Sequence, residues 1–264
     1  MNGFKVDLES EFGAYELSSR QKIARCLASR TNVKSLINLF RAVGGLRGCK
    51  IADVTVYGSN MRVYPGANRS DKIMLGMPHV FDRKEREVLA SQLRAEKLPS
   101  FVDVGANIGA YSAYVKGLGL DTKIIAIEAD PEMFARLSFN IPGGVTKLNV
   151  AVADEEGTLP FYINDHNRGE NSLVSGVGKR IEVKALTLSR IIEQNGIDVP
   201  TVIKIDVEGM EEKILESYFK STPSDKLAKM IILEYIHNQK LLSIMADKGY
   251  KIKLRTKLNA VFCR

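Results

Sequence analysis

The sequence of 264 residues has no tryptophan and only three cysteines, Cys26, Cys49 and Cys263, which lie far apart. An odd, widely spaced set of cysteines is typical of a reducing compartment and argues against a disulfide framework or a zinc site. No run of about eighteen apolar residues occurs, so no transmembrane helix is expected. The polar N-terminus also lacks the apolar core of a signal peptide. These absences lead us to expect a cytoplasmic protein.

The net charge of +7 is concentrated at the two ends of the chain. Residues 1–50 hold nine basic and four acidic residues, and residues 248–264 hold six basic and no acidic residues. Residues 51–247 hold 23 basic and 27 acidic residues. A nucleic-acid enzyme more often carries positive charge around its active face, so we expect no nucleic-acid partner. We expect the basic ends to be solvated surface, with a site for anionic partners as the alternative.

The most informative stretch runs from Phe101 to Tyr111 and reads FVDVGANIGAY. An apolar run broken by Asp103 predicts a buried parallel strand whose carboxylate must meet a donor or a cation. The glycines at 105 and 109 then predict a tight turn, in which Asn107 tolerates positive φ better than other non-glycine residues. A helical pattern follows. Such a unit can turn backbone N–H groups and a helix N-terminus toward one small ligand.

A second apolar strand, Ile124 to Asp130, ends in acidic residues. Glu128 lies about twenty-five residues after Asp103, near the spacing at which an acid binds a ribose diol. The dinucleotide fingerprint is incomplete, because Asn107 replaces its second glycine and Ala110 its third. This departure disfavours a nicotinamide oxidoreductase. It favours a nucleoside ligand without a pyrophosphate, such as S-adenosylmethionine.

From Phe101 onward, apolar strands alternate with helical patterns, which predicts an α/β fold with a parallel sheet and helices on both faces. We divide the chain into an N-terminal helical extension with a β-hairpin, residues 1–80, and a ligand-binding domain, residues 81–264. Later strands are expected at 148–153, 159–163, 182–186, 202–206, 230–235, 250–254 and 260–263.

The N-terminal extension begins with a helical pattern at residues 18–45, capped by Ser18 or Ser19 and ended by Gly44 and Gly45. It carries several basic residues. We expect it to pack on the core, with a helix lying on a membrane surface as the alternative. The hairpin spans residues 51–64. The side chains of Tyr57, Tyr64 and His79 could roof a ligand site, but a structural role is expected for each.

In open α/β sheets, ligands bind beyond the carboxyl ends of the strands. Several acids and one histidine fall there. Their abundance suits a cationic sulfonium ligand better than a polyphosphate. The residues at these ends are Asp103, Glu128, Asp154, Asp206, Glu208, Glu234 and His237.

The stretch VIKIDVEG, residues 202–209, places Lys204 and Asp206 on the same side of a strand. A buried lysine must pair, and Asp103 and Asp206 are its expected partners if the first and fourth strands are neighbours. Asp206 ends the strand nearest the reacting group. His237 is a candidate general base because its pKa is naturally near neutrality, and a structural role is the alternative.

Two further readings of the polar residues are weaker. Asp206, Glu234 and Asn238 could collect a divalent metal, although we expect no metal site. Asn171 and Ser172, in the polar loop 166–175, could touch the substrate or the donor.

Seven motifs occur in a characteristic order, reading VDVGANIGAYS, IEADP, NVAVADEEG, ENSLV, LTLSRII, IKIDVEGMEEKIL and LEYIHN. In this order they resemble the FkbM-type methyltransferase family. The resemblance runs from about Asp82 to the C-terminus and covers residues 1–80 poorly. It implies a class I, S-adenosylmethionine-dependent fold with a seven-stranded sheet whose last strand is antiparallel. It also implies O-methylation of a hydroxyl, commonly on a sugar or glycan or a secondary metabolite.

The resemblance assigns roles residue by residue. Asp103, Gly105, Asn107 and Gly109 would surround the methionine part of the donor, and Glu128 would bind the ribose. The backbone near Ala153 and Asp154 would border the adenine. The acceptor side would hold Asp206, Glu208 and Glu234.

The tripeptide Val207-Glu208-Gly209 contains neither the proline pair of amino-methylating nucleic-acid enzymes nor a nucleophilic cysteine. This composition favours an O-methyltransferase. The alternative is a non-catalytic accessory protein that binds the donor and docks to anionic surfaces through its basic ends.

Overall fold

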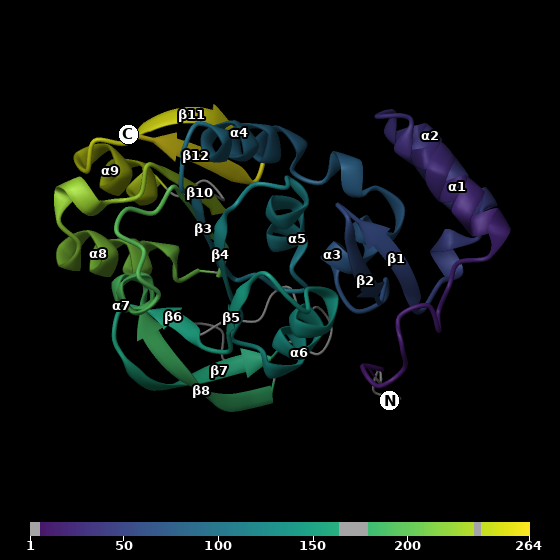
Figure 1. The fold of residues 1–264 in the computed structure, drawn as a ribbon, viewed down its shortest axis with the longest axis horizontal. Coiled ribbons are helices and arrows are strands. Elements are labelled where there is room, and N and C mark those ends of the chain that lie inside the picture. The colour runs from purple at the N-terminus through teal and green to yellow at the C-terminus, as the bar shows by residue number, and fades with distance from the viewer. Residues whose placement is uncertain (1–5, 164–178, 208, 235–238) are drawn as a thin grey trace.

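The computed structural model describes residues 6–163, 179–207, 209–234 and 239–264 (Figure 1). Among these residues, no helix is both long enough and apolar enough to cross a lipid bilayer. The helices are α1 (Ser19–Ser29), α2 (Lys34–Val43), α3 (Arg69–Gly76), α4 (Arg83–Arg94), α5 (Ala110–Gly117), α6 (Pro131–Asn140), α7 (Leu188–Gln194), α8 (Glu211–Ser221) and α9 (Gln239–Asp247). The strands are β1 (Ala52–Val56), β2 (Ser59–Val63), β3 (Ser100–Val104), β4 (Lys123–Ile127), β5 (Thr146–Leu148), β6 (Ala151–Ala153), β7 (Gly157–Ile163), β8 (Lys179–Thr187), β9 (Val202–Ile205), β10 (Met230–Glu234), β11 (Lys251–Arg255) and β12 (Asn259–Cys263).

A seven-stranded sheet forms the centre of the molecule, in the order β11-β12-β10-β9-β3-β4-β5. The strands β10, β9, β3, β4 and β5 pair in parallel, whereas β12 runs antiparallel to both β10 and β11. The expected α/β class and the antiparallel last strand are therefore confirmed. The strand order changes direction at β3, where open α/β sheets bind their ligands.

Helices cover both faces of this sheet (Figure 1). Alternate residues of β9 divide between the two faces, as its sequence predicts. Ile203 and Ile205 join the apolar cluster beneath α7, α8 and α9. Val202 joins the cluster beneath α4 and α5 on the opposite face. The same strand therefore supports both layers.

A separate three-stranded sheet, in the order β6-β8-β7, corrects one prediction. The single strand expected at 148–153 divides into β5, in the central sheet, and β6, in the small one. Asn149 lies at the break, and its side-chain amide donates to the carbonyls of Glu128 at 2.8 Å and Ala129 at 3.2 Å. This contact fixes the chain between β5 and β6 beside the residues that follow β4.

The N-terminal helical pattern forms two antiparallel helices rather than one. Ser18 caps α1 in a capping box and Gly44 ends α2, as predicted, but the chain reverses between them. The helices approach so closely that a Cβ on Gly44 would lie 2.1 Å from that of Ala24. This close contact requires glycine at the end of α2.

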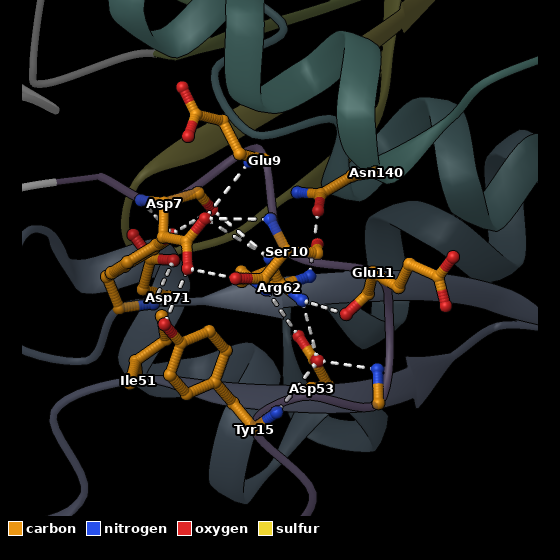
Figure 2. Close-up of polar contacts among 12 residues, drawn as sticks. Asp7, Glu9, Ser10, Glu11, Tyr15, Ile51, Asp53, Arg62, Asp71 and Asn140 are labelled. Atoms are coloured by element: carbon orange, nitrogen blue, oxygen red, sulfur yellow. Dashed lines mark hydrogen bonds and ion pairs between the residues drawn. The ribbon is translucent and has the colours of Figure 1, made fainter.

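A buried arginine in the hairpin, Arg62, holds the N-terminal arm, the segment before α1, against the hairpin and α6 (Figure 2). Arg62 pairs with both carboxylate oxygens of Asp53, at 2.7 and 2.8 Å, and also donates to three backbone carbonyls of the arm. Its backbone N–H donates to the side chain of Asn140 at 2.8 Å. One apolar cluster also includes residues from both sides of position 80. The division of the chain at that position stays a prediction.

Candidate active site

The turn after β3 has the backbone that its sequence predicts. Gly105, Asn107 and Gly109 have φ angles of +75°, +52° and +90°, in the left-handed region. A Cβ on Gly105 would lie 1.9 Å from the carbonyl oxygen of Asp206. Glycine is therefore required where this turn meets the end of β9.

The N–H groups of this turn do not point to an open cradle, which corrects the expectation that they face a ligand. Those of Gly105 and Ala106 donate to the carbonyl of Ile127, at 3.0 and 2.9 Å, and that of Gly109 donates to Ala106. The N–H of Asn107 donates to Glu128, and that of Ile108 to the Asn107 side chain. Since a pyrophosphate would need such donors, this turn suits a ligand without one.

Glu128, directly after β4, is a buried carboxylate held by backbone groups. Its Oε2 accepts from the N–H of Asn107 at 2.7 Å, and its Oε1 accepts from the N–H of Asp130 at 2.9 Å. Burial raises its pKa to about 7, although these two hydrogen bonds oppose the rise. No ion pair involves Glu128 among the residues that the structure describes. Hydroxyl donors from a ligand would complete its environment.

Asp103 faces the interior rather than an open surface. Its Oδ2 accepts from the backbone N–H and the hydroxyl of Ser112 in α5, at 3.1 and 2.7 Å. Lys204 is its direct neighbour across the β3–β9 pair. Burial raises the pKa of Asp103, and the positive charge of Lys204 opposes that rise.

Lys204 is buried, and its Nζ lies 2.8 Å from Oδ2 of Asp206 and 5.0 Å from the ring centre of Tyr111. The predicted pairing of this lysine is therefore confirmed. Burial disfavours its charge, but Asp206 and Asp103 outweigh that cost and raise its pKa. In turn, Lys204 overcomes the effect of burial on Asp206 and lowers the pKa of that carboxyl. The pair stays ionised near neutral pH.

The structure brings Asp206 and Glu234 together, as their positions at strand ends predict. A hydrogen bond with the Glu234 side chain further lowers the pKa of Asp206, so the two carboxyls lie next to each other. Glu211 holds the turn after β9 by accepting from the N–H groups of Val207 at 3.1 Å and Gly209 at 3.0 Å. The side chain of Asp206 remains 38% exposed, which leaves it accessible to a substrate.

Three residues of this site were not assigned from the sequence. Asp82, with φ of +40°, accepts from the hydroxyl of Tyr111 at 3.0 Å, and its charge also acts on Lys204. Burial raises the pKa of Asp82. Asn68 donates to the side chain of Asn107 at 3.2 Å, so the N-terminal extension contacts the glycine turn after β3. The sequence could have indicated Tyr111, because it lies within the GANIGAY motif. Asp82 and Asn68 lie outside any motif.

Other candidates are placed away from this cluster. Ala153 ends β6, and the carbonyl of Asp154 accepts from Ser217 of α8, so their role at the adenine stays a prediction. Tyr57, Tyr64 and His79 bond to backbone groups of the N-terminal extension, the structural role that was expected. Five candidates lie outside the described residues: Asn171, Ser172, Glu208, His237 and Asn238.

The part of the chain that the structure describes contains no group of three or more His, Cys, Asp or Glu residues able to hold a metal ion. The proposed set of Asp206, Glu234 and Asn238 includes one residue outside that part.

The strand order, the glycine turn after β3 and the acid after β4 define an S-adenosylmethionine-dependent methyltransferase of class I. The chain belongs to the FkbM family, since the sequence model of the methyltransferase FkbM domain matches residues 103–252. The resemblance inferred from the motifs is thereby confirmed.

Two similar proteins are named as methyltransferases. The hexuronic acid methyltransferase AglP of Haloferax volcanii is 25% identical over 67% of this chain and 74% of its own length. The methyltransferase sdnD of Sordaria araneosa is 24% identical over 58% of this chain and 74% of its own length. Among solved structures, a precorrin-6y C5,15-methyltransferase from Geobacter metallireducens covers 69% of this chain and 88% of its own, with 16% identity and a TM-score of 0.43.

The residues present fit S-adenosylmethionine as the donor. Glu128 is a buried carboxylate that accepts one backbone hydrogen bond on each oxygen, and the hydroxyls of a ribose would supply further donors. The turn at 105–109 uses its N–H groups internally, which suits a nucleoside without phosphates.

Proposed function

We propose that this protein methylates a hydroxyl oxygen on a sugar, a glycan or a secondary metabolite. The observation that carries the proposal is the accessible, ionised carboxylate of Asp206 at the end of β9, fixed by Lys204. A carboxylate in this position can accept a hydrogen bond from an acceptor hydroxyl and hold its oxygen for attack. The name of the Haloferax volcanii relative, a hexuronic acid methyltransferase, supports a sugar acceptor.

We assign the donor to the side of β3 and β4. Glu128 would accept from the ribose hydroxyls, while Gly105, Asn107 and Gly109 shape the turn beside the methionine part, close to Asp103. The backbone at Ala153 and Asp154 would border the adenine. When bound, S-adenosylmethionine supplies a methyl group carried on a positively charged sulfur.

We assign the acceptor to the side of β9 and β10. Asp206 orients the hydroxyl, and Glu208 and Glu234 complete the acidic surroundings. The lowered pKa of Asp206 makes it a weak base at neutral pH. We therefore assign proton removal to His237, because histidine is the side chain whose unperturbed pKa lies closest to neutrality.

The test is a transfer assay with donor labelled in its methyl group and a panel of hexuronic acid glycosides, neutral hexose glycosides and amino-sugar glycosides. The proposal predicts label on a hydroxyl acceptor that survives mild alkali, as a methyl ether does. Label released by mild alkali would show a methyl ester on a carboxyl group instead. Label on the amine nitrogen of the amino sugars would also contradict O-methylation.

A further inference from the structure

The positive charge of this protein is concentrated in one short segment. Residues 17–50 contain eight basic residues and no acidic residue, while the remainder of the chain contains 30 basic and 31 acidic residues. This segment forms α1, α2 and the turn that follows α2. The two helices lie at the edge of the molecule, beyond β1 and β2 and away from the central sheet (Figure 1). The charge of this segment, +8, exceeds the net charge of +7 of the whole chain, and of its eight basic residues only Arg41 is buried.

The same helical pair also exposes large apolar side chains. Ile23 is 61% exposed and Val43 is 58% exposed, values unusual for aliphatic residues in the middle or last turn of a helix. We call the combined surface of exposed apolar and basic residues the α1–α2 face. Its apolar members are Ile23, Leu27, Val33, Leu36, Leu39 and Val43. Its basic members are Arg20, Lys22, Arg30, Lys34, Arg47 and Lys50.

The α1–α2 face is held firmly on the protein body. Arg25, on α1, donates to the carbonyl of Leu75 at 2.9 Å and to that of Thr55 at 3.0 Å. Arg20 donates to the carbonyl of Val43, which joins the start of α1 to the end of α2. The exposed aliphatic side chains are therefore presented on a fixed support, and not on a loose arm.

We propose that the α1–α2 face docks this protein on the surface of an anionic lipid bilayer. Aliphatic side chains of an interfacial helix enter the boundary between headgroups and acyl chains, while neighbouring lysines and arginines contact anionic headgroups. The α1–α2 face offers both kinds of group. Residues 17–50 contain no acid, and Glu16, just before them, pairs with Lys22 at 3.1 Å.

The charge of the α1–α2 face argues against two other occupants. A second copy of the α1–α2 face would bring six positive charges against six, with no acid within residues 17–50 to compensate them. A nucleic acid would satisfy the charge but gains little from exposed leucine, isoleucine and valine side chains, because its affinity depends on phosphate contacts. A bilayer with anionic headgroups satisfies both the charge and the apolar side chains.

The other basic end of the chain has a different explanation. Lys251 and Lys253 lie on β11, the exposed edge strand of the central sheet. Charged side chains, lysine above all, protect such edges from pairing with another chain. These two lysines therefore provide a matched control for the removal of positive charge.

The experiment is vesicle flotation of the full chain with two compositions, phosphatidylcholine alone and equal parts of phosphatidylcholine and phosphatidylglycerol. We expect binding only to the mixed vesicles, and we expect about 0.5 M salt to weaken it, because salt screens exposed charges. The double variant R30Q/K34Q should lower the partition coefficient about tenfold or more. The double variant I23N/L39N should lower it to a similar degree, whereas K251Q/K253Q should bind as the unmodified protein does.

Each variant is also measured for its thermal unfolding midpoint and for donor affinity, because a misfolded variant would lose binding for the wrong reason. The substituted residues are exposed and lie outside the candidate active site, so both values should be unchanged. No binding to the mixed vesicles would overturn the proposal, as would equal losses in K251Q/K253Q. A concentration-dependent dimer that I23N/L39N abolishes would assign the α1–α2 face to self-association instead. Methyl transfer in solution is independent of these outcomes.

Discussion

Two carboxylates on either side of β3 show how the same chemical group is given opposite properties. Glu128, after β4, is held by two backbone N–H groups, and its pKa is raised to about 7 by burial. Asp206, after β9, is held by the ammonium of Lys204 at 2.8 Å, and its pKa is lowered. A full positive charge outweighs desolvation in the second case, whereas two backbone dipoles do not outweigh it in the first.

This difference separates the two halves of the site. The side of β4 is suited to a neutral partner that donates hydrogen bonds, such as a ribose diol. The side of β9 keeps a permanent negative charge at neutral pH, which is suited to orienting a hydroxyl near a cationic donor. Environments that push the pKa values of two nearby acids apart are typical of sites that divide roles between them.

The largest effect is expected from changing Asp206 to Asn. The substitution removes the charge that orients the acceptor, so kcat should fall by about 10²-fold or more, in the range typical of such groups. Donor affinity measured by calorimetry should stay within about threefold. The control is Asp198→Asn, at an exposed ion pair with Lys226, which should leave both values unchanged. Full kcat in Asp206→Asn would remove Asp206 from the mechanism.

The substitution Lys204→Met tests how much the ion pair of Lys204 with Asp206 contributes to the free energy of unfolding. It leaves Asp103 and Asp206 without their cation, and breaking a buried pair on one side costs about 3–5 kcal/mol in free energy of unfolding. Chemical denaturation of Lys204→Met measures this loss. Lys229→Met provides the matched control, because Lys229 pairs with Glu96 at 2.7 Å but is 44% exposed. The account would be contradicted if both lysines cost the same.

A smaller effect is expected in the pH dependence of unfolding, through Glu128. Since its folded pKa is raised from 4.5 to about 7, the folded state holds a proton that the unfolded state releases. Ionisation of Glu128 therefore destabilises the ligand-free protein as the pH rises from about 4.5 to about 7, by up to about 3 kcal/mol. The measurement is the free energy of unfolding by chemical denaturation across this pH range, with the Glu128→Gln variant as reference. The altered hydrogen bonds of that variant change its free energy of unfolding by the same amount at every pH.

The free energy of unfolding of the unmodified protein should fall relative to that of Glu128→Gln between these pH values and then level off. A constant difference across the range would show that the pKa of Glu128 is not raised. An increase with pH would show that a cation outside the described residues compensates it.

Much of this site follows from local sequence. The strand, turn and helix at 100–117 depend on neighbouring residues, and Asn107 adopts the positive φ that its side chain tolerates. The pairing of Lys204 follows from the cost of burying an unpaired ammonium within a strand. Helix caps at Ser18, Asp130 and Thr187 are also local, because each side chain accepts from a backbone N–H two or three residues further along the chain.

The remaining features depend on contacts between distant segments. The break between β5 and β6 depends on Asn149 reaching the carbonyl groups at the end of β4. Asp82 joins the site because its left-handed backbone turns it toward Tyr111, and no periodicity reveals such a conformation. The reversal between α1 and α2 lacks glycine and proline, so only the packing of Gly44 on Ala24 makes it evident.

The most direct test of the central claim is calorimetric titration of the full chain with S-adenosylmethionine, S-adenosylhomocysteine and NAD. The account predicts saturable binding of the two sulfur compounds and none of NAD. Glu128→Ala should weaken that binding by about ten- to a hundredfold, because two hydrogen bonds to a carboxylate are lost. Glu193→Ala, at an exposed ion pair on α7, should leave it unchanged. Binding of NAD, or equal affinity in Glu128→Ala, would contradict the assignment of the donor site.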